Sequence, residues 1–241
     1  MQNMEGKDSR GPDTPDPTFN ANDELHVCIK KGDLNRLKLL VQGRVGIDTV
    51  DAAGCTLLML AARYGHINIV AWLLDNNADA NLKAKDGKTA LIEAAEKGYL
   101  KICKILVPKT SDLNATATER GISALSFAAQ GGHKKICKLL IDMQADVNIK
   151  SQNGMTPLFW ACRVQDVDIF NMLIDAGADI LHRNHYQQTI LHFATLLENI
   201  DVCERAMELV KKALIHPEAV KKFVDHLDCF GHLALVTAIS C

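Results

Sequence analysis

The 241-residue sequence predicts an all-α solenoid of stacked helix–turn–helix units joined by short hairpin loops. Three observations predict it. Glycines recur 33 or 34 residues apart, a Thr or Ser follows each of them two residues later, and a pair of small residues follows at a fixed offset. The glycines are Gly54, Gly87, Gly121 and Gly154. A period of this length is typical of arrays in which each repeat is one supersecondary unit that must stack on its neighbours.

Each unit is expected to begin its first helix at a capping hydroxyl and to end it at a glycine. A Thr or Ser before an apolar run accepts a hydrogen bond from the first turn of a helix, and glycine adopts the left-handed conformation that ends one. The capping residues are Thr56, Thr89, Ser123 and Thr156, and the helix-ending glycines are Gly65, Gly98 and Gly132. Between them, a small pair such as Ala61-Ala62 lets another helix approach closely.

A second helix follows in each unit, and a turn then leads to the next unit. Apolar pairs at helical spacing, such as Ile69-Val70 and Leu73-Leu74, predict the helix. The stretch "NNADANLKAKDG" carries the Asp, Asn and Gly residues that are typical of turns. One unit cannot bury its apolar faces alone, so we expect neighbouring units to pack together.

The unit "DAAGCTLLMLAARYGHINIVAWLLDNNADANLKA" resembles an ankyrin repeat, and so do the units that begin at Ala84, Thr118 and Ser151. The family's T-P-L-H signature is best kept as "TPLF" at 156–159. Its histidine is replaced by Met59, Ile92, Ser126 and Phe159, and only His192 retains it. The resemblance therefore implies that the family's Thr–His hydrogen bond is mostly absent here.

The resemblance divides the chain into a tail and one ankyrin-repeat domain. Residues 1–21 are polar and rich in Gly, Pro and Asp, so we expect a disordered tail. The domain, 22–241, is expected to contain a cap at 22–50, repeats from about 51, 84, 118 and 151, a divergent unit at 184–227 and a partial unit at 228–241. The partial unit ends on the apolar stretch "LALVTAIS", which indicates either a longer parent array or a natural half-repeat cap.

Composition narrows the classes of protein that need to be considered. The net charge is −2 and no run approaches 18 apolar residues, so the sequence predicts neither a transmembrane helix nor a chain-wide attraction to nucleic acid or membrane. There is no apolar segment behind a basic start at the N-terminus, so no secretory signal is predicted. The eight cysteines are then expected to be free thiols in an intracellular protein of the cytoplasm, the nucleus or both.

No motif of catalysis, cofactor binding or metal binding stands out. Cys103, Cys137 and Cys203 share a repeat position with Val70 and Phe170, which predicts small buried hydrophobic residues. Successive repeats place equivalent residues about 10 Å apart, too far for a shared zinc ion. We therefore expect no enzyme, no cofactor and no metal.

An aromatic line recurs at the residue before the small pair, where Phe127, Trp160 and Phe193 stand. One interpretation is packing between adjacent first helices, which stripes at repeat spacing usually serve. The other is an apolar patch on the inner face that anchors a partner, since aromatic residues dominate interface energetics. The first is favoured.

The resemblance implies that a partner contacts the loop tips and the exposed end of the first helix, on the concave face. The predicted contact residues are Arg63, Tyr64, Lys83, Lys85, Lys88, Lys97, Arg120, Lys150, Met155, Trp160, Arg163, Arg183 and Tyr186. Across these variable positions nine basic residues oppose three acidic ones, at 86, 96 and 119, which gives a surplus of six positive charges. The sequence therefore predicts an electropositive face that favours an acidic or phosphorylated protein segment.

The sequence predicts a non-enzymatic scaffold for protein–protein interaction. An alternative is that the chain is the targeting or regulatory ankyrin module of a larger enzyme, such as a kinase or ubiquitin ligase. Nucleic-acid binding is disfavoured, because aromatic and basic residues do not alternate along the loop tips. The sequence indicates no oligomeric state.

Overall fold

The structure is a computed structural model that describes residues 21–44, 46–117, 120–196 and 200–225. The expected tail, except for its last residue, and the expected partial unit at 228–241 lie outside the described residues. Helix α1 begins at Ala21. The prediction of an all-α ankyrin solenoid is confirmed, since paired helices follow one another along the whole described chain.

Thirteen α-helices and one short hairpin form the described part of the chain. The first eight helices are α1 (Ala21–Lys31), α2 (Leu34–Arg44), α3 (Leu57–Tyr64), α4 (Ile67–Asp75), α5 (Ala90–Lys97), α6 (Leu100–Leu106), α7 (Ala124–Gln130) and α8 (Lys134–Asp142). The others are α9 (Pro157–Val164), α10 (Val167–Asp175), α11 (Ile190–Leu196), α12 (Ile200–Ala213) and α13 (Pro217–Val224). A 3₁₀ turn (Val107–Lys109) and the strands β1 (Thr116–Ala117) and β2 (Ile122–Ser123) lie between α6 and α7.

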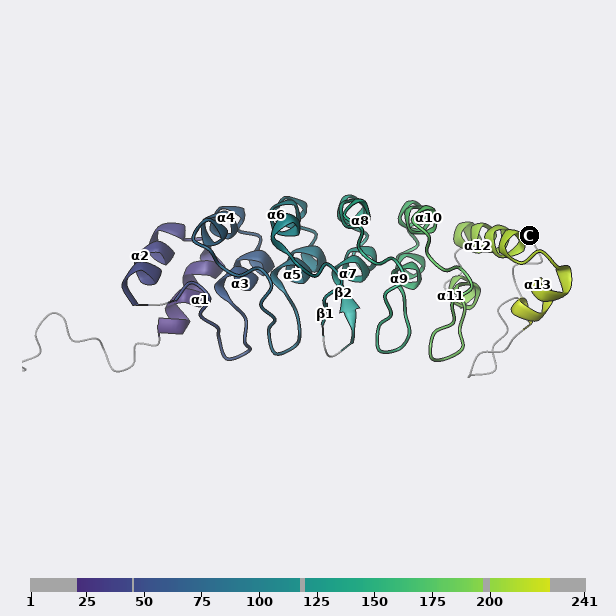
Figure 1. Cartoon of the computed structure of the whole chain (residues 1–241), viewed down its shortest axis with the longest axis horizontal. Helices are drawn as coiled ribbons and strands as arrows, with labels where there is room; N and C mark the ends of the chain where they lie inside the picture. The colour runs from purple at the N-terminus through teal and green to yellow at the C-terminus, as the bar shows by residue number, and fades with distance from the viewer. Residues whose placement is uncertain (1–20, 45, 118–119, 197–199, 226–241) are drawn as a thin grey trace, which may run out of the picture.

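The helices form two rows along the array (Figure 1). One row contains α3, α5, α7, α9 and α11, in which each helix contacts the next, and we call these the inner helices. The other row contains α4, α6, α8 and α10, and the hairpin loops project on the side away from it. Each repeat therefore contacts only its neighbours, as in other solenoids.

Side-chain caps begin most inner helices as expected. The hydroxyls of Thr56, Thr89 and Ser123 accept hydrogen bonds from the backbone N–H three residues later, at 3.2 to 3.3 Å. Thr156 is also the N-cap of its helix, α9, as predicted, but its side chain makes no capping hydrogen bond, so that part of the prediction is wrong. The Phe159 N–H instead donates to the backbone carbonyl of Thr156 at 3.0 Å.

The hydrogen bond that the family's histidine makes is kept in one unit and replaced by another side chain in a second unit. His192 Nδ1 lies 2.9 Å from Thr189 Oγ1 and accepts from the Thr189 N–H at 3.1 Å. At the equivalent position in the first full repeat, the sulfur of Met59 accepts from the Thr56 N–H at 3.4 Å. A thioether thus replaces the ring nitrogen, although sulfur is a weaker acceptor.

Glycines end α3, α5 and α7, and a ring of the following repeat packs against the first two of these glycines. Gly65 and Gly98 cap α3 and α5 in the left-handed conformation, as predicted. A Cβ added at Gly98 would lie 2.5 Å from the His133 ring, and one at Gly65 would lie 2.7 Å from Tyr99. The prediction for α7 is off by one residue, because Gly131 is its cap and the left-handed residue, Gly132, comes after it.

Adjacent hairpin loops are linked to one another by their backbones. The N–H of Lys85 donates to the Ala53 carbonyl at 3.0 Å, and the N–H of His185 donates to the Asn153 carbonyl at the same distance. The N–H of Gln152 likewise donates to the Arg120 carbonyl at 2.9 Å, so these loops are tied in pairs along the border of the array.

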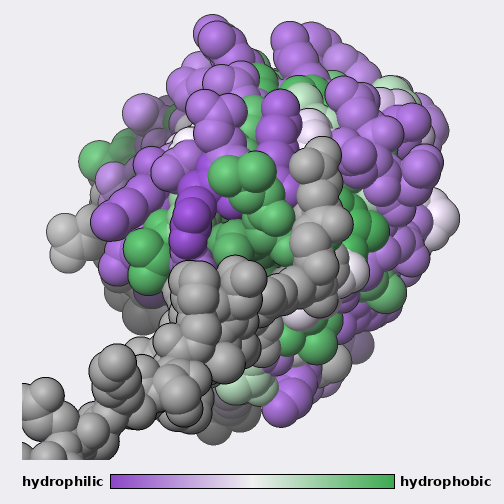
Figure 2. All heavy atoms as spheres, turned by 90° about the vertical axis from the view of Figure 1, so that its left-hand side faces the viewer, coloured by the Kyte–Doolittle hydropathy of each residue, from purple (hydrophilic) through white to green (hydrophobic). Residues whose placement is uncertain are grey.

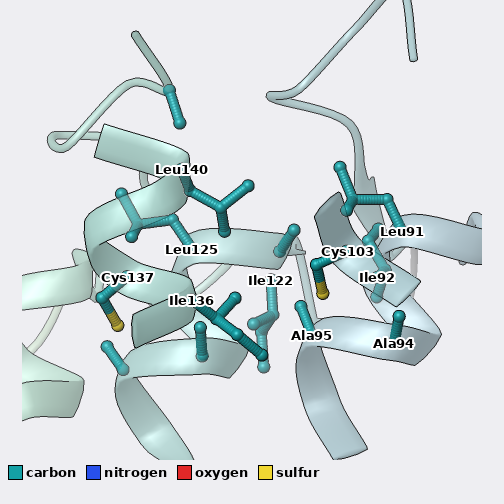
Figure 3. Packing of buried hydrophobic residues seen from close by; sticks show 14 of the residues in the cluster. Leu91, Ile92, Ala94, Ala95, Cys103, Ile122, Leu125, Ile136, Cys137 and Leu140 are labelled. Atoms are coloured by element: carbon teal, nitrogen blue, oxygen red, sulfur yellow. The ribbon is translucent and has the colours of Figure 1, made fainter. Parts of the chain in front are cut away.

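The core is a continuous layer between the helices, and the small pairs lie within it. Ala61, Ala95 and Ala129 have no exposed surface, and neither do Cys103 and Cys137. Figure 3 shows the two thiols among buried aliphatic side chains. Burial raises the pKa of both thiols from 9.0 to about 12, which fits the prediction that these cysteines act as small hydrophobic residues.

The N-terminal end of the array is not uniformly polar. Viewed from that end, hydrophobic surface lies among hydrophilic side chains (Figure 2). Val27 on α1 and Leu39 on α2 are 48% and 65% exposed. No described helix is long and apolar enough to cross a bilayer.

The divergent unit keeps the helix pair but lengthens it. Gln187 occupies the hairpin glycine position and adopts the left-handed conformation with φ of 60°. The additional residues extend the second helix, α12, to 14 residues and form α13 after it. The sequence also places Glu198 where a helix-ending glycine would stand in this unit, but Glu198 lies outside the described residues.

We expect Gly98→Ala to destabilise the chain more than Gly177→Ala. Both glycines are left-handed, with φ of 79° and 90°, but only Gly98 faces another group, since nothing lies within 4 Å of a Cβ built at Gly177. Backbone strain alone should cost Gly177→Ala about 1 kcal/mol, and contact with His133 should at least double that cost in Gly98→Ala. Guanidinium unfolding measures the free energy of unfolding of both variants. Equal losses of stability would contradict a destabilising clash with His133 in Gly98→Ala.

We expect the free energy of unfolding to fall as the pH rises above about 9. An unfolded thiol ionises near 9.0, whereas the buried thiols of Cys103 and Cys137 keep their protons to about 12. The folded state then binds more protons, so alkaline pH favours unfolding by about 1 kcal/mol per thiol near pH 10. The variant Cys103→Val/Cys137→Val carries at both positions the residue found at Val70. Its free energy of unfolding, measured with urea, should decline less between pH 8 and pH 10 than that of the unmodified chain. An unchanged pH dependence of the free energy of unfolding would contradict the raised pKa values of Cys103 and Cys137.

Candidate partner-binding surface

Three repeat positions line the side of the inner helices next to the hairpin loops, and we call this the inner surface. The hairpin position follows the hairpin glycine, the mid-helix position precedes the small pair, and the helix-end position follows it. The hairpin positions are Cys55, Lys88, Ile122, Met155 and Gln188, the mid-helix positions are Leu60, Glu93, Phe127, Trp160 and Phe193, and the helix-end positions are Arg63, Glu96, Gln130 and Arg163. The spacing of the repeats thus brings residues far apart in sequence into one surface.

The N-terminal part of this surface is a charged cluster formed by Arg63, Lys88, Glu93, Glu96 and Lys97. Arg63 donates to both carboxylate oxygens of Glu93, at 2.8 and 3.0 Å. Lys88 Nζ lies 2.6 Å from Glu96 and 3.9 Å from Glu93, and Lys97 lies 3.5 Å from Glu96. Glu93 is only 1% exposed, so its charge depends on these partners.

Ionisation in the charged cluster is set by these pairs. The hydrogen bond to Glu93 raises the pKa of Arg63 against the effect of burial. Burial alone would lower the pKa of Lys88, but the bond to Glu96 and the nearby Glu93 charge raise it. Burial alone would raise the pKa of Glu96, but Lys88 lowers it. Arg63, Lys88 and Glu96 therefore stay charged near neutral pH.

The ion pairs change the predicted charge balance. Glu93 stands in the otherwise apolar mid-helix position and was not counted among the acidic residues of the face. Arg63, Lys88 and Lys97 are committed to Glu93 and Glu96. The sequence carried a signal for this: Glu93 follows Arg63 by 30 residues, three fewer than one repeat, which places the two side by side on adjacent inner helices.

The C-terminal part is an aromatic cluster formed by Phe127, Met155, Trp160 and Phe193. The guanidinium of Arg163 lies 5.6 Å from the centroid of Trp160, and Lys88 lies 5.3 Å from that of Phe127. Phe193 meets the core residue Phe159 edge to face at 5.3 Å. Met155 and Trp160 are each 8% exposed. Packing between adjacent helices thus buries most of the surface of Met155 and Trp160.

The other predicted contact residues are dispersed. Lys85 Nζ donates to the Ala52 carbonyl at 2.7 Å, and Arg183 is half-buried with its guanidinium 5.1 Å from the Phe223 ring centroid. Tyr64 is half-buried on α3, whereas Tyr186 is exposed on the last hairpin. The exposed cations Lys83, Arg120, Lys150 and Arg163 have no carboxylate within ion-pairing distance in the described part of the chain.

Known proteins share this architecture and its sequence pattern. A sequence profile for ankyrin repeats in three copies matches residues 25–117 and 115–184. The chain belongs to the ankyrin-repeat family. The match supports a protein–protein interaction module, because arrays of this kind present an extended surface to partners.

Several relatives contain similar repeats within much longer chains. M-phase phosphoprotein 8 of Mus musculus is 37% identical over 94 residues, which cover 37% of this chain and 11% of the relative. The inactive serine/threonine-protein kinase TEX14 of the same species is 33% identical over 90 residues, 37% of this chain and 6% of the relative. The ankyrin repeat and KH domain-containing protein mask of Drosophila melanogaster is 42% identical over 60 residues, 25% of this chain and 2% of the relative.

A solved structure shares the fold over most of the chain. It is the predatory endopeptidase Bd0816 from Bdellovibrio bacteriovorus in complex with immunity protein Bd3460. The matching chain in it is 28% identical, with a TM-score of 0.70, and the alignment covers 76% of this chain and 96% of the other.

We expect Arg63→Ala to be strongly destabilising, because it leaves the buried carboxylate of Glu93 without its closest partner. Breaking a buried ion pair typically costs about 3–5 kcal/mol. Arg63→Ala/Glu93→Leu should recover most of the loss, since the equivalent position already holds Leu60. Arg163→Ala is the control: it removes an exposed arginine of the equivalent position and should cost less than about 1 kcal/mol. Guanidinium unfolding tests the ordering, and similar losses in the two single variants would contradict it.

Proposed function

We propose that the chain recognises a protein partner through its inner surface and performs no catalysis itself. Rigid stacked repeats support this proposal, since a preformed surface loses little ordering entropy on binding. Six described cysteines are buried free thiols, which makes none of them a suitable nucleophile. Within the described residues, no three His, Cys, Asp or Glu side chains cluster so as to hold a metal ion.

The partner segment is proposed to be acidic or phosphorylated. One observation carries this: Glu93 and Glu96 are already bound to cations of the chain, while Arg120, Lys150 and Arg163 are exposed and have no carboxylate partner among the described residues. The positive surplus is therefore smaller than the sequence predicted. Its unpaired part includes Lys83 as well as Arg120, Lys150 and Arg163; Arg163 lies in the inner surface and the other three lie in the loops between helices. An acidic segment would complement it.

We also propose an intracellular setting, in the cytoplasm, the nucleus or both. The six buried free thiols support it, because reducing compartments preserve thiols. We propose neither membrane nor nucleic-acid binding.

A second candidate is a targeting or regulatory module of a larger enzyme, such as a kinase or ubiquitin ligase. It is supported by the relatives, in which the matched repeats are a small share of each chain and one is named an inactive serine/threonine-protein kinase. A reading frame that joins these repeats to a catalytic domain would favour this candidate.

We expect Arg120→Glu/Lys150→Glu/Arg163→Glu to lose a partner that the unmodified chain captures from cell extract. These cations have no ion pair to break in the described structure, so the variant should stay folded. Lys101→Glu/Lys104→Glu/Lys135→Glu changes the charge equally on the exposed outer helices α6 and α8 and is the matched control.

Capture followed by mass spectrometry identifies the partner, and repeating it from about 0.05 to 0.5 M salt should weaken binding, because salt screens exposed charges. Equal capture by both triple variants, or capture that salt does not change, would contradict electrostatic recognition by the inner surface.

A further inference from the structure

Two buried polar atoms on the inner surface have no hydrogen-bond partner among the described residues. They are Nε1 of Trp160, a donor on α9, and Oε1 of Gln130, an acceptor at the end of α7. Trp160 as a whole is 8% exposed. Buried polar atoms are normally paired, so each orphaned atom in a native structure calls for an explanation.

The two atoms belong to one place between α7 and α9. Gln130 precedes Trp160 by 30 residues, as Arg63 precedes Glu93, so the two pairs occupy equivalent positions in the array. In the Arg63–Glu93 pair the side chains meet at 2.8 Å. Helices α7 and α9 are also in direct contact. A donor and an acceptor thus lie unsatisfied at a junction where the preceding repeats form an ion pair.

Arg163 adds an unpaired cation beside this junction. It occupies the same helix-end position as Arg63, but the residue 30 positions later is Phe193 instead of an acid. Its guanidinium lies over the Trp160 ring at 5.6 Å. The array itself shows what an arginine binds here, since Arg63 holds the carboxylate of Glu93.

Resting on the proposed function, we propose that Trp160, Arg163 and Gln130 form a site for an Asp or Glu residue in an extended segment of the partner. The carboxylate accepts from the Arg163 guanidinium and the Trp160 indole N–H, as Glu93 accepts from Arg63. Gln130 Oε1 accepts a backbone N–H of the same segment. Arg163 is exposed and its guanidinium lies over the face of the ring, so rotation of its side chain accompanies binding and brings the guanidinium to the carboxylate at the indole edge.

The charges at the site disfavour a cationic ligand. Aromatic clusters often bind cations, but here Lys88 and Arg163 already lie over the rings of Phe127 and Trp160. A lysine or arginine of a partner would be repelled by them, whereas a carboxylate is attracted and accepts from the indole N–H, and a backbone N–H of the same segment pairs with Gln130 Oε1.

A phage-displayed library of random twelve-residue peptides, selected on the full chain, tests the site. The chain has two tryptophans, so Trp72→Phe leaves Trp160 as the only fluorescent reporter. We expect the enriched peptides to share one Asp or Glu at a fixed position and to shift the Trp160 emission. Replacing that residue by Asn or Gln should weaken binding roughly tenfold, an effect of about 1.4 kcal/mol.

Two conservative variants show whether the expected atoms are involved. Arg163→Gln should weaken binding roughly tenfold and remove the preference for the acidic over the amide peptide. Trp160→Phe keeps an aromatic ring of the kind found at Phe127 and Phe193 and removes the indole N–H, and it should also weaken binding severalfold. Lys101→Gln on the outer helix α6 should change nothing.

The possible outcomes separate this site from the proposed function. Peptides that lose binding to the inner-surface triple variant but lack a fixed acid, or that bind Arg163→Gln and Trp160→Phe normally, would overturn the carboxylate site alone. A shared phosphate-requiring or basic residue would do the same. Peptides that bind the triple variant of Arg120, Lys150 and Arg163 as tightly as the unmodified chain would overturn recognition by the inner surface and the loops beside it.

Discussion

The close approach of neighbouring inner helices is the constraint on which the rest of this structure depends. Fully buried alanines such as Ala95 and Ala129 allow it, and a glycine such as Gly98 accepts the ring of the next repeat at a distance that no Cβ would tolerate. Because this contact recurs in successive repeats, the spacing between equivalent side chains stays nearly constant. The inner surface is therefore set by which residue occupies each position, on a backbone that barely changes.

Much of this fold could be predicted from the sequence, because the repeat period, the helix caps and the pairs of small residues are all required for the close packing of neighbouring inner helices. The failures were local. Thr156 does not cap with its side chain, since the Phe159 N–H turns to the Thr156 carbonyl, and consecutive glycines after α7 shifted the expected helix end by one residue. Neither outcome can be predicted from the spacing of the repeats. In the first case two acceptors of the same threonine compete for one N–H, and in the second either of two adjacent glycines can end the helix.

The candidate surface was less predictable than the fold. The repeat pattern located its positions but treated each one separately, whereas charge depends on pairs that cross from one repeat to the next. Glu93 was therefore left out of the predicted charge balance, although it holds Arg63 in a bidentate ion pair. Burial of Trp160 agrees with the favoured interpretation of the aromatic line as packing between adjacent first helices, although Trp160 was also predicted to contact a partner.

The change in chemistry along the mid-helix position, from Glu93 to Phe127, Trp160 and Phe193, gives the array a polarity that its repeated backbone lacks. An extended ligand lying along it would find saturated ion pairs at one end and aromatic rings with an unmatched cation at the other. Reversing such a ligand would misplace every contact at once. A scaffold made of near-copies can thereby distinguish the head of its ligand from the tail.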